Sequence, residues 1–422
     1  MKGEFPVIGA DVAKDFCYYA ALSPTGETYL KPFKALNTGE GLASVINQIE
    51  KVEKAFNRKP VIVLESTGHY SNRLVHFFTR HNLKVYLINP LLSHSIKNST
   101  VRKVKTDKVD AEELAKMYFF MNLKEHQMQD EYLENLKILT RTHYHLSEQR
   151  VSVMNQLKAA IEQVMPGFTK VFKSISCKTS LELLVRYPSP TSFLEGTKDD
   201  IVQIVRTTSR TSMAYATKKY ELILKSAQEG KETGILLTAY EQIIIVYANH
   251  LKHINEQLDL IDKKIEALAI NIPAIQLLRS IPGIGKNLAP IIAGEIGSIA
   301  RFQSSKQLVA YCGIDPSVKQ SGNFIGTKNK FTKGGSRFIR KALYIAATVA
   351  IRQNPNGQYV NKVIYDYYHK KIQIKAKKQA LGAVMNKLVR IIFSVLKNEN
   401  PFVLITPEEQ VKMHRSNVKI VA

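Results

Sequence analysis

The chain has 422 residues, of which 45% are hydrophobic, enough for two or three domains with buried cores. Lys and Arg outnumber Asp and Glu by 60 to 36, and the formal net charge of +24 favours a polyanionic partner such as nucleic acid. Three scattered cysteines, with no secretory or membrane-spanning apolar run, argue against structural zinc, disulfides and a membrane protein, so we expect a soluble, cytoplasmic protein.

The first quarter of the chain alternates strand and helix patterns, which predicts a mixed sheet with helices on its faces. Short apolar runs predict strands over residues 6–11, 61–65 and 84–89, and a hairpin is expected over residues 16–33. Helical periodicity covers residues 42–56, the segment around 74–78 and residues 106–117. We assign residues 1–125 to this α/β domain.

Residues 126–270 have a different pattern, that of two long helices. The second helix carries apolar residues at unbroken 3-4 spacing, a seam about 37 Å long: Ile244, Tyr247, Leu251, Ile254, Leu258, Ile261, Ile265 and Leu268. Residues 130–165 keep a similar but more polar rhythm. We predict a coiled-coil oligomerisation region interrupted by an insertion at residues 166–239. The helices pair either within one chain or between chains, and an ordinary helix bundle is the alternative.

Residues 271–400 are predicted to form a third, mainly helical domain, followed by a tail at residues 401–422. It opens with the sequence IPGIG at residues 281–285, followed by an apolar helix over 288–296. Gly283 and Gly285 leave backbone N–H groups near a helix N-terminus, which suits a phosphate. This pattern resembles a helix-hairpin-helix DNA-binding motif. A tight turn between two packed helices explains it equally well.

Four carboxylates stand out in the N-terminal domain. Asp11 and Glu65 each end an apolar strand, so neighbouring strands would place them side by side. Asp107 and Asp110 lie three residues apart on a helix, about 4.5 Å apart along its axis. Four converging carboxylates repel one another unless divalent cations neutralise them, and Mg²⁺ prefers such oxygen ligands.

Each of these acids alone is a weak signal, and three of them also have a plain structural interpretation. Asp11 is compatible with a turn at a strand end, and Asp107 and Asp110 with the first turn of a helix, where acids are favoured. Glu112 and Glu113 lie close by on the same helix and compete for the same role. The order and spacing of the four acids together carry the metal-site prediction.

A basic, glycine-rich loop covers residues 311–341. The loop contains many cationic residues but only one acidic residue, Asp315. Its glycines allow the backbone to approach phosphates closely. A solvated surface loop is the alternative. The predicted nucleic-acid contacts are Lys319, Lys328, Lys330, Lys333, Arg337, Arg340 and Lys341. Ser321 is the most prominent hydroxyl, with Ser317 and Ser336 as competitors; taken alone, it is typical of a turn.

Several of these motifs together resemble the DEDD-type insertion-sequence transposases, a group that includes Piv-type DNA invertases and bridge-RNA-guided recombinases. They are GADVAK at residues 9–14, ESTGHY at 65–70, NP at 89–90 and KTDKVDA at 105–111. The resemblance implies a RuvC-like (RNase H-like) fold. It also implies a catalytic, metal-binding tetrad: Asp11, Glu65, Asp107 and Asp110. Two Mg²⁺ ions about 4 Å apart suit such carboxylates in phosphoryl transfer, with Mn²⁺ as the alternative ion.

The C-terminal region extends this resemblance. Residues 313–343 resemble the C-terminal transposase domain of the family, and the sequence QSG at 320–322 matches its catalytic serine. The likeness, which covers about residues 5–160 and 270–360, implies that Ser321 attacks a DNA phosphate and forms a covalent intermediate. We expect both domains to contribute to one composite active site. Family likeness also implies a structured noncoding guide RNA that pairs with DNA.

The sequence therefore predicts a DNA transposase or site-specific recombinase in the cytoplasm of a bacterial or archaeal cell, associated with the nucleoid. We expect a homo-oligomer, a dimer or tetramer, assembled through the long helices. One alternative is an RNase H-like nuclease or Holliday-junction resolvase that activates water with metal. Another is a non-catalytic nucleic-acid-binding scaffold. A kinase of the same superfamily is disfavoured because phosphate-binding glycines are missing near Asp11.

Overall fold

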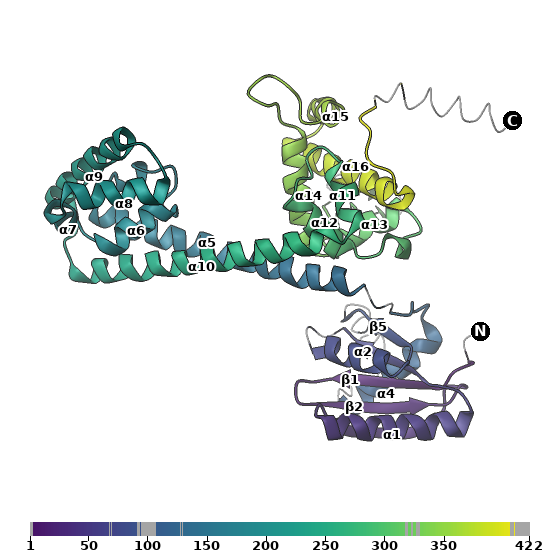
Figure 1. Ribbon diagram of the computed structural model, residues 1–422. Coiled ribbons are helices and arrows are strands. Elements are labelled where there is room, and N and C mark those ends of the chain that lie inside the picture. The colour runs from purple at the N-terminus through teal and green to yellow at the C-terminus, as the bar shows by residue number, and fades with distance from the viewer. Residues whose placement is uncertain are drawn as a thin grey trace. The chain divides into compact units, whose positions relative to one another are not determined.

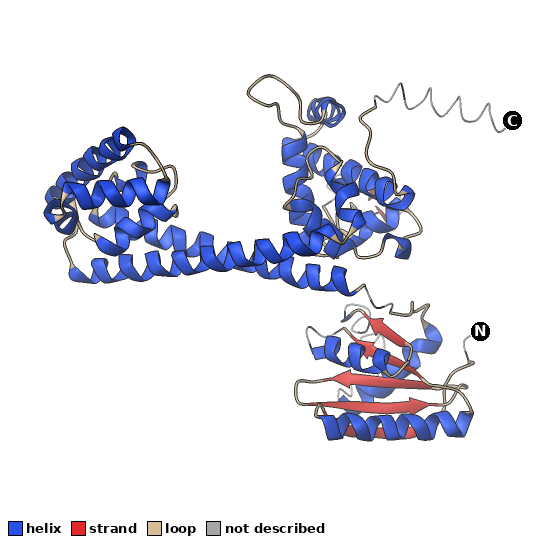
Figure 2. Cartoon of the chain, viewed as in Figure 1, coloured by secondary structure: helices blue, strands red, loops and turns tan. Residues whose placement is uncertain are grey.

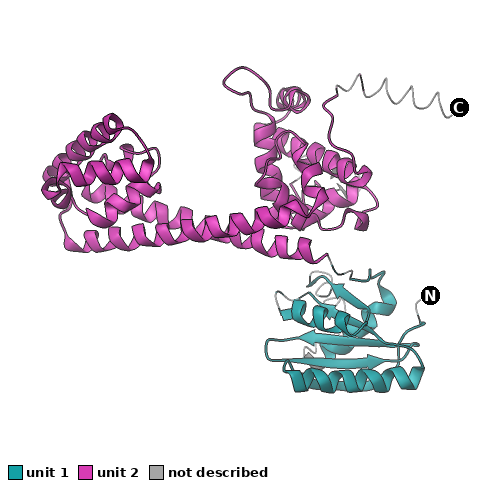
Figure 3. Ribbon diagram, in the orientation of Figure 1, with its two compact units in different colours: residues 1–128 teal, residues 129–422 magenta. Residues whose placement is uncertain are grey.

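The chain forms two compact units, which meet in sequence between Met128 and Gln129 (Figure 3). Each unit is described by itself below. The structure, a computed structural model, describes residues 3–66, 70–90, 107–126, 130–316 and 330–405, together with Gly68, Ser93, Met128, Gln320, Ser321, Phe324, Ile325 and Glu409.

The first unit is built on a five-stranded sheet, whose strands are drawn in red in Figure 2. The strand order is β3-β2-β1-β4-β5. Its strands are β1 (Val7–Val12), β2 (Phe16–Leu22), β3 (Thr28–Leu36), β4 (Val61–Glu65) and β5 (Val85–Ile88). β1, β2 and β3 pair antiparallel, whereas β1, β4 and β5 pair parallel. The prediction of a mixed sheet with helices is confirmed.

Three helices cover the two faces of this sheet (Figure 1). They are α1 (Gly39–Phe56), α2 (Tyr70–Arg80) and α4 (Asp107–Phe120). Alternate residues of β1 and β4, such as Ile8 and Ile62, pack with α1 and α2. The intervening residues, such as Val7 and Val63, pack with Leu114 of α4. Both faces of the central strands are therefore buried, which explains their continuous apolar runs.

The helix α4 lies directly on β1 at Gly9. A Cβ atom at Gly9 would lie 2.0 Å from the carbonyl oxygen of Ala111 and 2.7 Å from the backbone nitrogen of Ala115. No other residue type fits there unless the helix moves, because real Cβ contacts are longer than 3.0 Å. The glycine in the sequence GADVAK therefore sets how closely α4 approaches the sheet.

We predict that Gly9→Ala lowers the free energy of unfolding by about 1–3 kcal/mol, because the added methyl group must push α4 away from β1. Gly39→Ala is the matched control, since no atom lies within 4 Å of its Cβ position. Chemical denaturation followed by circular dichroism measures both. Equal stabilities of the two variants would show that the contact between α4 and β1 is looser than described.

The second unit contains two long helices, α5 (Glu131–Val164) and α10 (Thr238–Ile270), which run side by side in opposite directions (Figure 1). Five of the predicted seam residues of α10 are buried: Ile244, Leu251, Ile254, Leu258 and Ile261. Three others, Tyr247, Ile265 and Leu268, are partly buried. Of the pairings left open by the sequence, the one within a single chain is present.

The segment between the long helices folds into a helical subdomain around a core of its own. Its elements are η1 (Phe168–Lys170), α6 (Lys178–Arg186), α7 (Pro190–Glu195), α8 (Lys198–Ser209) and α9 (Met213–Thr233). Phe193 stacks near Phe168 and Tyr187, with ring centroids 5.6 and 5.3 Å away, and this core continues onto α5 and α10.

The C-terminal part of the second unit is a helical bundle with a small hairpin. Its elements are α11 (Pro273–Arg279), α12 (Leu288–Ile296), η2 (Ile299–Arg301), α13 (Ser305–Tyr311), β6 (Gln320–Ser321), β7 (Phe324–Ile325), α14 (Arg337–Ala350), α15 (Lys362–Ile372) and α16 (Lys377–Asn398). Among the described helices, α16 passes a length-and-composition test for a membrane span. Its most apolar stretch is 56% buried, and Val384 and Leu388 pack in the bundle core, as expected of a core helix.

A partly buried ion pair joins this bundle to α5. Arg141 of α5 donates from Nε and Nη2 to the two carboxylate oxygens of Glu295 on α12, at 2.6 and 3.0 Å. The Glu295 side chain is fully buried, whereas that of Arg141 is 40% exposed. Burial by itself raises the pKa of Glu295, but hydrogen bonds from Arg141 and Ser336 outweigh it and lower the pKa below its ordinary value.

We predict that Arg141→Met lowers the free energy of unfolding by roughly 3–5 kcal/mol at pH 7, because it leaves a buried carboxylate without its cation. Glu295→Gln is expected to cost less, about 1–3 kcal/mol, because the exposed part of Arg141 can be hydrated. Denaturation of each variant by urea gives both values. Equal costs would contradict the asymmetry in burial.

The lowered pKa of Glu295 also fixes a pH dependence. In the unmodified chain the ion pair stabilises the fold fully above the unfolded-state pKa of about 4.3, and this contribution is lost as the pH falls through the lower folded-state pKa. In Arg141→Met the carboxyl of Glu295 loses the hydrogen bonds that lower its pKa most, so we expect its pKa to rise. The cost of that substitution should therefore shrink as the pH falls towards about 4, since the carboxyl becomes neutral.

Candidate functional site

Asp11 and Glu65 occupy matching positions on neighbouring parallel strands. The register pairs Ala10 of β1 with Leu64 of β4, so Asp11 and Glu65 each follow one residue later at the same edge. Neighbouring strands lie about 4.8 Å apart, and side chains alternate between faces. Both carboxylates therefore belong to the face that α4 covers, and both are half-buried. Ser93 donates from Oγ to Oε2 of Glu65 at 3.0 Å.

The first turn of α4 lies towards this edge of the sheet. Leu114 and Met117, further along α4, pack with Val7 at the beginning of β1. The helix therefore runs antiparallel to β1, and its N-terminal end lies towards the end of the strand. Asp110, which is half-buried, directly precedes the residue whose carbonyl contacts Gly9. The backbone of Asp107 begins α4, but its side chain lies outside the described residues.

The described side chains do not by themselves form a metal site. Among them, no group of three or more His, Cys, Asp or Glu residues is close enough to hold an ion. The structure thus brings Asp11 and Glu65 to adjacent positions and Asp110 to the helix above the same face. The four-carboxylate metal site stays a prediction, and carboxylate oxygens remain the donor type that Mg²⁺ prefers.

Glu112 and Glu113, the competing acids on α4, both form ion pairs with Lys116. Lys116 Nζ lies 3.0 Å from Glu112 and 3.2 Å from Glu113, in both cases from Oε1. Burial lowers the pKa of Lys116, but these two partners raise it above its ordinary value. Glu112 also accepts a hydrogen bond from Thr28 at 3.2 Å. These contacts favour Asp110 over Glu113 as the partner of the sheet carboxylates.

Ser321 lies on a two-stranded hairpin in the second unit. Its backbone pairs with Phe324, and a bridge between Pro316 and Phe331 closes the base of the hairpin. The Ser321 side chain lies outside the described residues, as does all of Ser317. The other competitor, Ser336, caps α14, because its Oγ accepts the backbone N–H groups of Phe338 and Ile339. Ser336 therefore has a structural role.

The predicted cationic contacts have different environments. Lys330 and Lys333 are exposed. Arg337 and Lys341 lie over the ring of Tyr144 on α5, at 5.7 and 4.0 Å from its centroid. Two further predicted contacts lie outside the described residues, namely Lys319 and Lys328.

Arg340 has a structural role that sequence reasoning missed. Its Nη1 donates to the carbonyl oxygens of Cys312 and Gly335, at 3.2 and 3.1 Å, and so ties together the two ends of the hairpin segment. Nothing in the local sequence signals this role, because both acceptors are backbone atoms. In a basic stretch of sequence, an arginine that contacts phosphate cannot be distinguished from one that bonds to the protein's own backbone.

The two glycines of the IPGIG turn also differ. Gly283 has φ of +105°, and a Cβ there would lie 2.9 Å from the Cβ of Ala350, so its packing against α14 requires glycine. Gly285 has open space instead, and its carbonyl oxygen accepts N–H groups at the beginning of α12. The helix-hairpin-helix assignment and its phosphate contact stay predictions.

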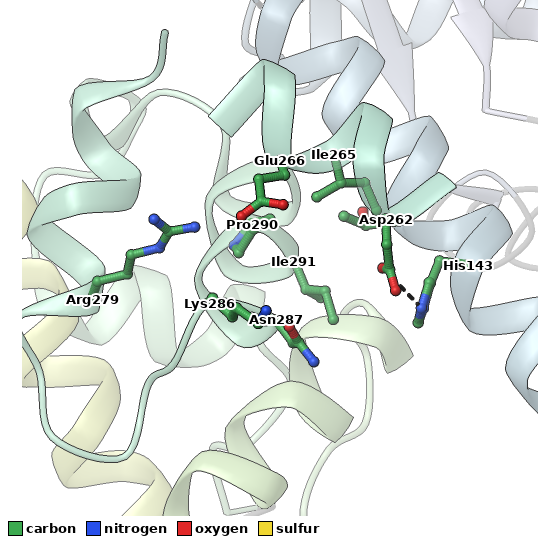
Figure 4. A pocket seen from close by; sticks show the side chains of 10 residues that line it. His143, Asp262, Ile265, Glu266, Arg279, Lys286, Asn287, Pro290 and Ile291 are labelled. Carbon is green, nitrogen blue, oxygen red and sulfur yellow. Dashed lines mark ion pairs between the residues drawn. The ribbon is translucent and has the colours of Figure 1, made fainter. Parts of the chain in front are cut away.

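A pocket of about 190 Å³ lies beside this turn (Figure 4). Lys286 and Arg279 lie in its wall with the acids Asp262 and Glu266. His143 Nε2 lies 3.2 Å from Oδ1 of Asp262, which links α5 to α10 at the pocket rim. Cations and acids share this small pocket, so it has no strong preference for an anion.

Comparison with known proteins decides the family. One family model, described as a transposase of the DEDD type from IS110 elements, matches residues 8–166. A second, described as transposase of the IS116/IS110/IS902 family, matches residues 275–361. The chain belongs to the IS110 family of transposases. The first match contains the four acids and α5, and the second contains Ser321 and the IPGIG turn.

Curated relatives agree with this assignment along most of the chain. An insertion element IS110 protein of Streptomyces coelicolor is 22% identical over 93% of this transposase and 94% of the relative. The pilin gene-inverting protein of Moraxella bovis is 23% identical over 81% of both chains. An insertion element IS116 protein of Streptomyces clavuligerus is 20% identical over 96% of this chain and 97% of its own.

The tether formed by Arg340 yields a prediction about stability. We expect Arg340→Gln to lower the free energy of unfolding by about 2–3 kcal/mol, because two carbonyls lose a charged donor. Lys330→Gln, its control, should change stability by less than about 0.5 kcal/mol. Thermal denaturation of both variants tests this, and an unchanged stability for Arg340→Gln would contradict the tether.

Proposed function

We propose that this IS110-family protein cuts and rejoins DNA in transposition or site-specific inversion, with a metal-binding carboxylate site and Ser321 as the nucleophile. The observation that carries this proposal is the matched position of Asp11 and Glu65 on neighbouring strands, beneath a helix that begins with Asp107 and Asp110. The pilin gene-inverting relatives support a DNA substrate.

The proposed chemistry divides between the acids and the serine. Ser321 attacks a backbone phosphate of DNA, its hydroxyl proton is lost, and the displaced deoxyribose oxygen takes up a proton as it leaves. Attack by a deoxyribose hydroxyl on the phosphoserine then reverses these steps and joins the new strand. Asp11, Glu65, Asp107 and Asp110 would hold divalent ions, which activate the attacking oxygen and stabilise the leaving oxygen when bound.

The partners are part of the same proposal. The excess of 60 basic over 36 acidic residues favours nucleic acid, and we propose a structured noncoding RNA as the guide that pairs with DNA. We also propose that the protein acts as a homo-oligomer in the cytoplasm. Apolar side chains exposed on α10, such as Val246 and Leu260, are available for contact between copies.

The decisive experiment incubates the purified protein with the flanking DNA of its own element and its noncoding transcript, in Mg²⁺ or EDTA. Products are resolved on denaturing gels with and without protease. We predict a protein–DNA adduct in Mg²⁺ that EDTA abolishes and that Ser321→Ala reduces by roughly 100-fold or more. Ser317→Ala is the matched control and should retain it. An adduct that survives in Ser321→Ala would show that another residue is the nucleophile.

The acids are tested in the same assay. Asp11→Asn should abolish the adduct, whereas Glu113→Gln should retain it, because Glu113 pairs with Lys116. Free cleaved ends without any adduct would favour a nuclease that uses water. DNA binding without any cleavage by the unmodified protein would favour a non-catalytic scaffold.

A further inference from the structure

The second unit has a large groove to which no function has been assigned above. It has a volume of about 1270 Å³, above the roughly 300–1,000 Å³ of typical small-molecule pockets. One wall is α16, and the other is formed by residues at the base of the Ser321 hairpin and by α15. A site of this size and shape suits a stretch of a polymer.

One face of α16 lines the groove. Lys378, Gly382 and Asn386 follow one another at four-residue spacing, and Gln379, Ala383, Lys387 and Arg390 widen the same stripe. The opposite face of α16, which includes Val384 and Leu388, is buried in the bundle core. The groove face is thus the polar side of an amphipathic helix, held in place by its apolar side.

The charge of the groove has a single sign. Six of its lining residues are cationic and none is acidic: Lys330, Lys333, Lys375, Lys378, Lys387 and Arg390. Burial lowers the pKa of Lys387, so its ammonium group lies in a partly water-excluded place. Arg390 is held by a 3.0 Å hydrogen bond from Nε to Asn386. This arrangement attracts a chain of phosphates.

Two aromatic rings lie among these cations. Phe331 packs directly on α16 at Gly382, where a Cβ would lie 2.7 Å from its Cζ. Lys387 lies 4.6 Å from the centroid of the Tyr367 ring. Cations that follow a backbone, with aromatic rings between them, are the combination by which proteins hold single-stranded nucleic acid.

We propose that this groove binds single-stranded DNA next to the Ser321 hairpin. Pro316 and Phe331, which form the bridge at the base of the hairpin, both line the groove. A strand in the groove therefore leads towards the serine that we propose attacks DNA, and the choice of DNA over RNA rests on that proposed function. A single strand is favoured over a duplex because the rings can stack only on bases that are unpaired.

Binding of a fluorescent 20-nucleotide DNA strand to the full chain, in EDTA to prevent cleavage, tests the proposal. We expect Lys378→Gln/Arg390→Gln to weaken binding about tenfold at moderate salt and to reduce the slope of log affinity against log salt by about 1.4. The matched control is Lys218→Gln/Lys225→Gln on α9, which removes two exposed charges far along the same unit. An equal loss of DNA affinity in both double variants would contradict binding in the groove.

A second measurement uses the absence of tryptophan from the chain. Tyr367→Trp places a reporter in the groove, and we expect single-stranded DNA to quench its fluorescence. Tyr215→Trp, at an exposed position on α9, should not be quenched. An unquenched groove tryptophan in a folded protein that binds DNA would overturn the proposal.

The same titrations with RNA of equal sequence and with duplex DNA locate the preference. Tighter groove-dependent binding of either competitor than of single-stranded DNA would contradict the assignment. Because these assays involve no cleavage, their outcome is independent of whether Ser321 forms an adduct. The groove and the proposed chemistry can therefore fail separately.

Discussion

The backbone of α4 touches the backbone of β1 at Gly9, and the geometry of the first unit follows from this contact. Only a residue without a Cβ allows the carbonyl of Ala111 to lie where it does. The contact on β1 lies at Gly9, two residues before Asp11. The contact on α4 lies at Ala111, one residue after Asp110. A wider separation would move the acids of α4 away from the strand carboxylates, and metal ligands must lie within a few ångströms of one ion.

The second unit also uses glycine for close approach, and two examples are Gly294 and Gly382. Gly294 lets α12 approach α5, since a Cβ there would lie 3.0 Å from the backbone nitrogen of Lys137, and Gly382 receives the ring of Phe331. Close approach alone is not directional, so the bidentate pair of Arg141 and Glu295 adds orientation at the first of these contacts. The bundle that carries the hairpin is thus held on a long, stiff helix.

Local patterns in the sequence were sufficient to predict the sheet and its helices. The expected strand at residues 61–65 matches β4, and the expected helix at 106–117 differs from α4 by a few residues at its end. Contacts between distant positions have no local signal. Arg141 and Glu295 are 154 residues apart, and Arg340 bonds to carbonyls rather than side chains. The order and spacing of the four acids predicted the metal site. Their catalytic role and that of Ser321 came from the family resemblance, because Asp11, Asp107, Asp110 and Ser321 each also suit a turn or a helix end.

These environments change how the net charge of +24 is interpreted. Arg340 and Arg141 are committed to internal partners, and Lys116 to two glutamates, so none of them is fully available to a phosphate. The lysines around α16 lie on a concave surface without an acid, where several act on the same stretch of an anionic chain. Counterion release depends on cations that contact phosphates, not on the total charge. We therefore expect a small number of lysine and arginine residues to provide most of the affinity for nucleic acid. A basic composition by itself does not show which residues these are.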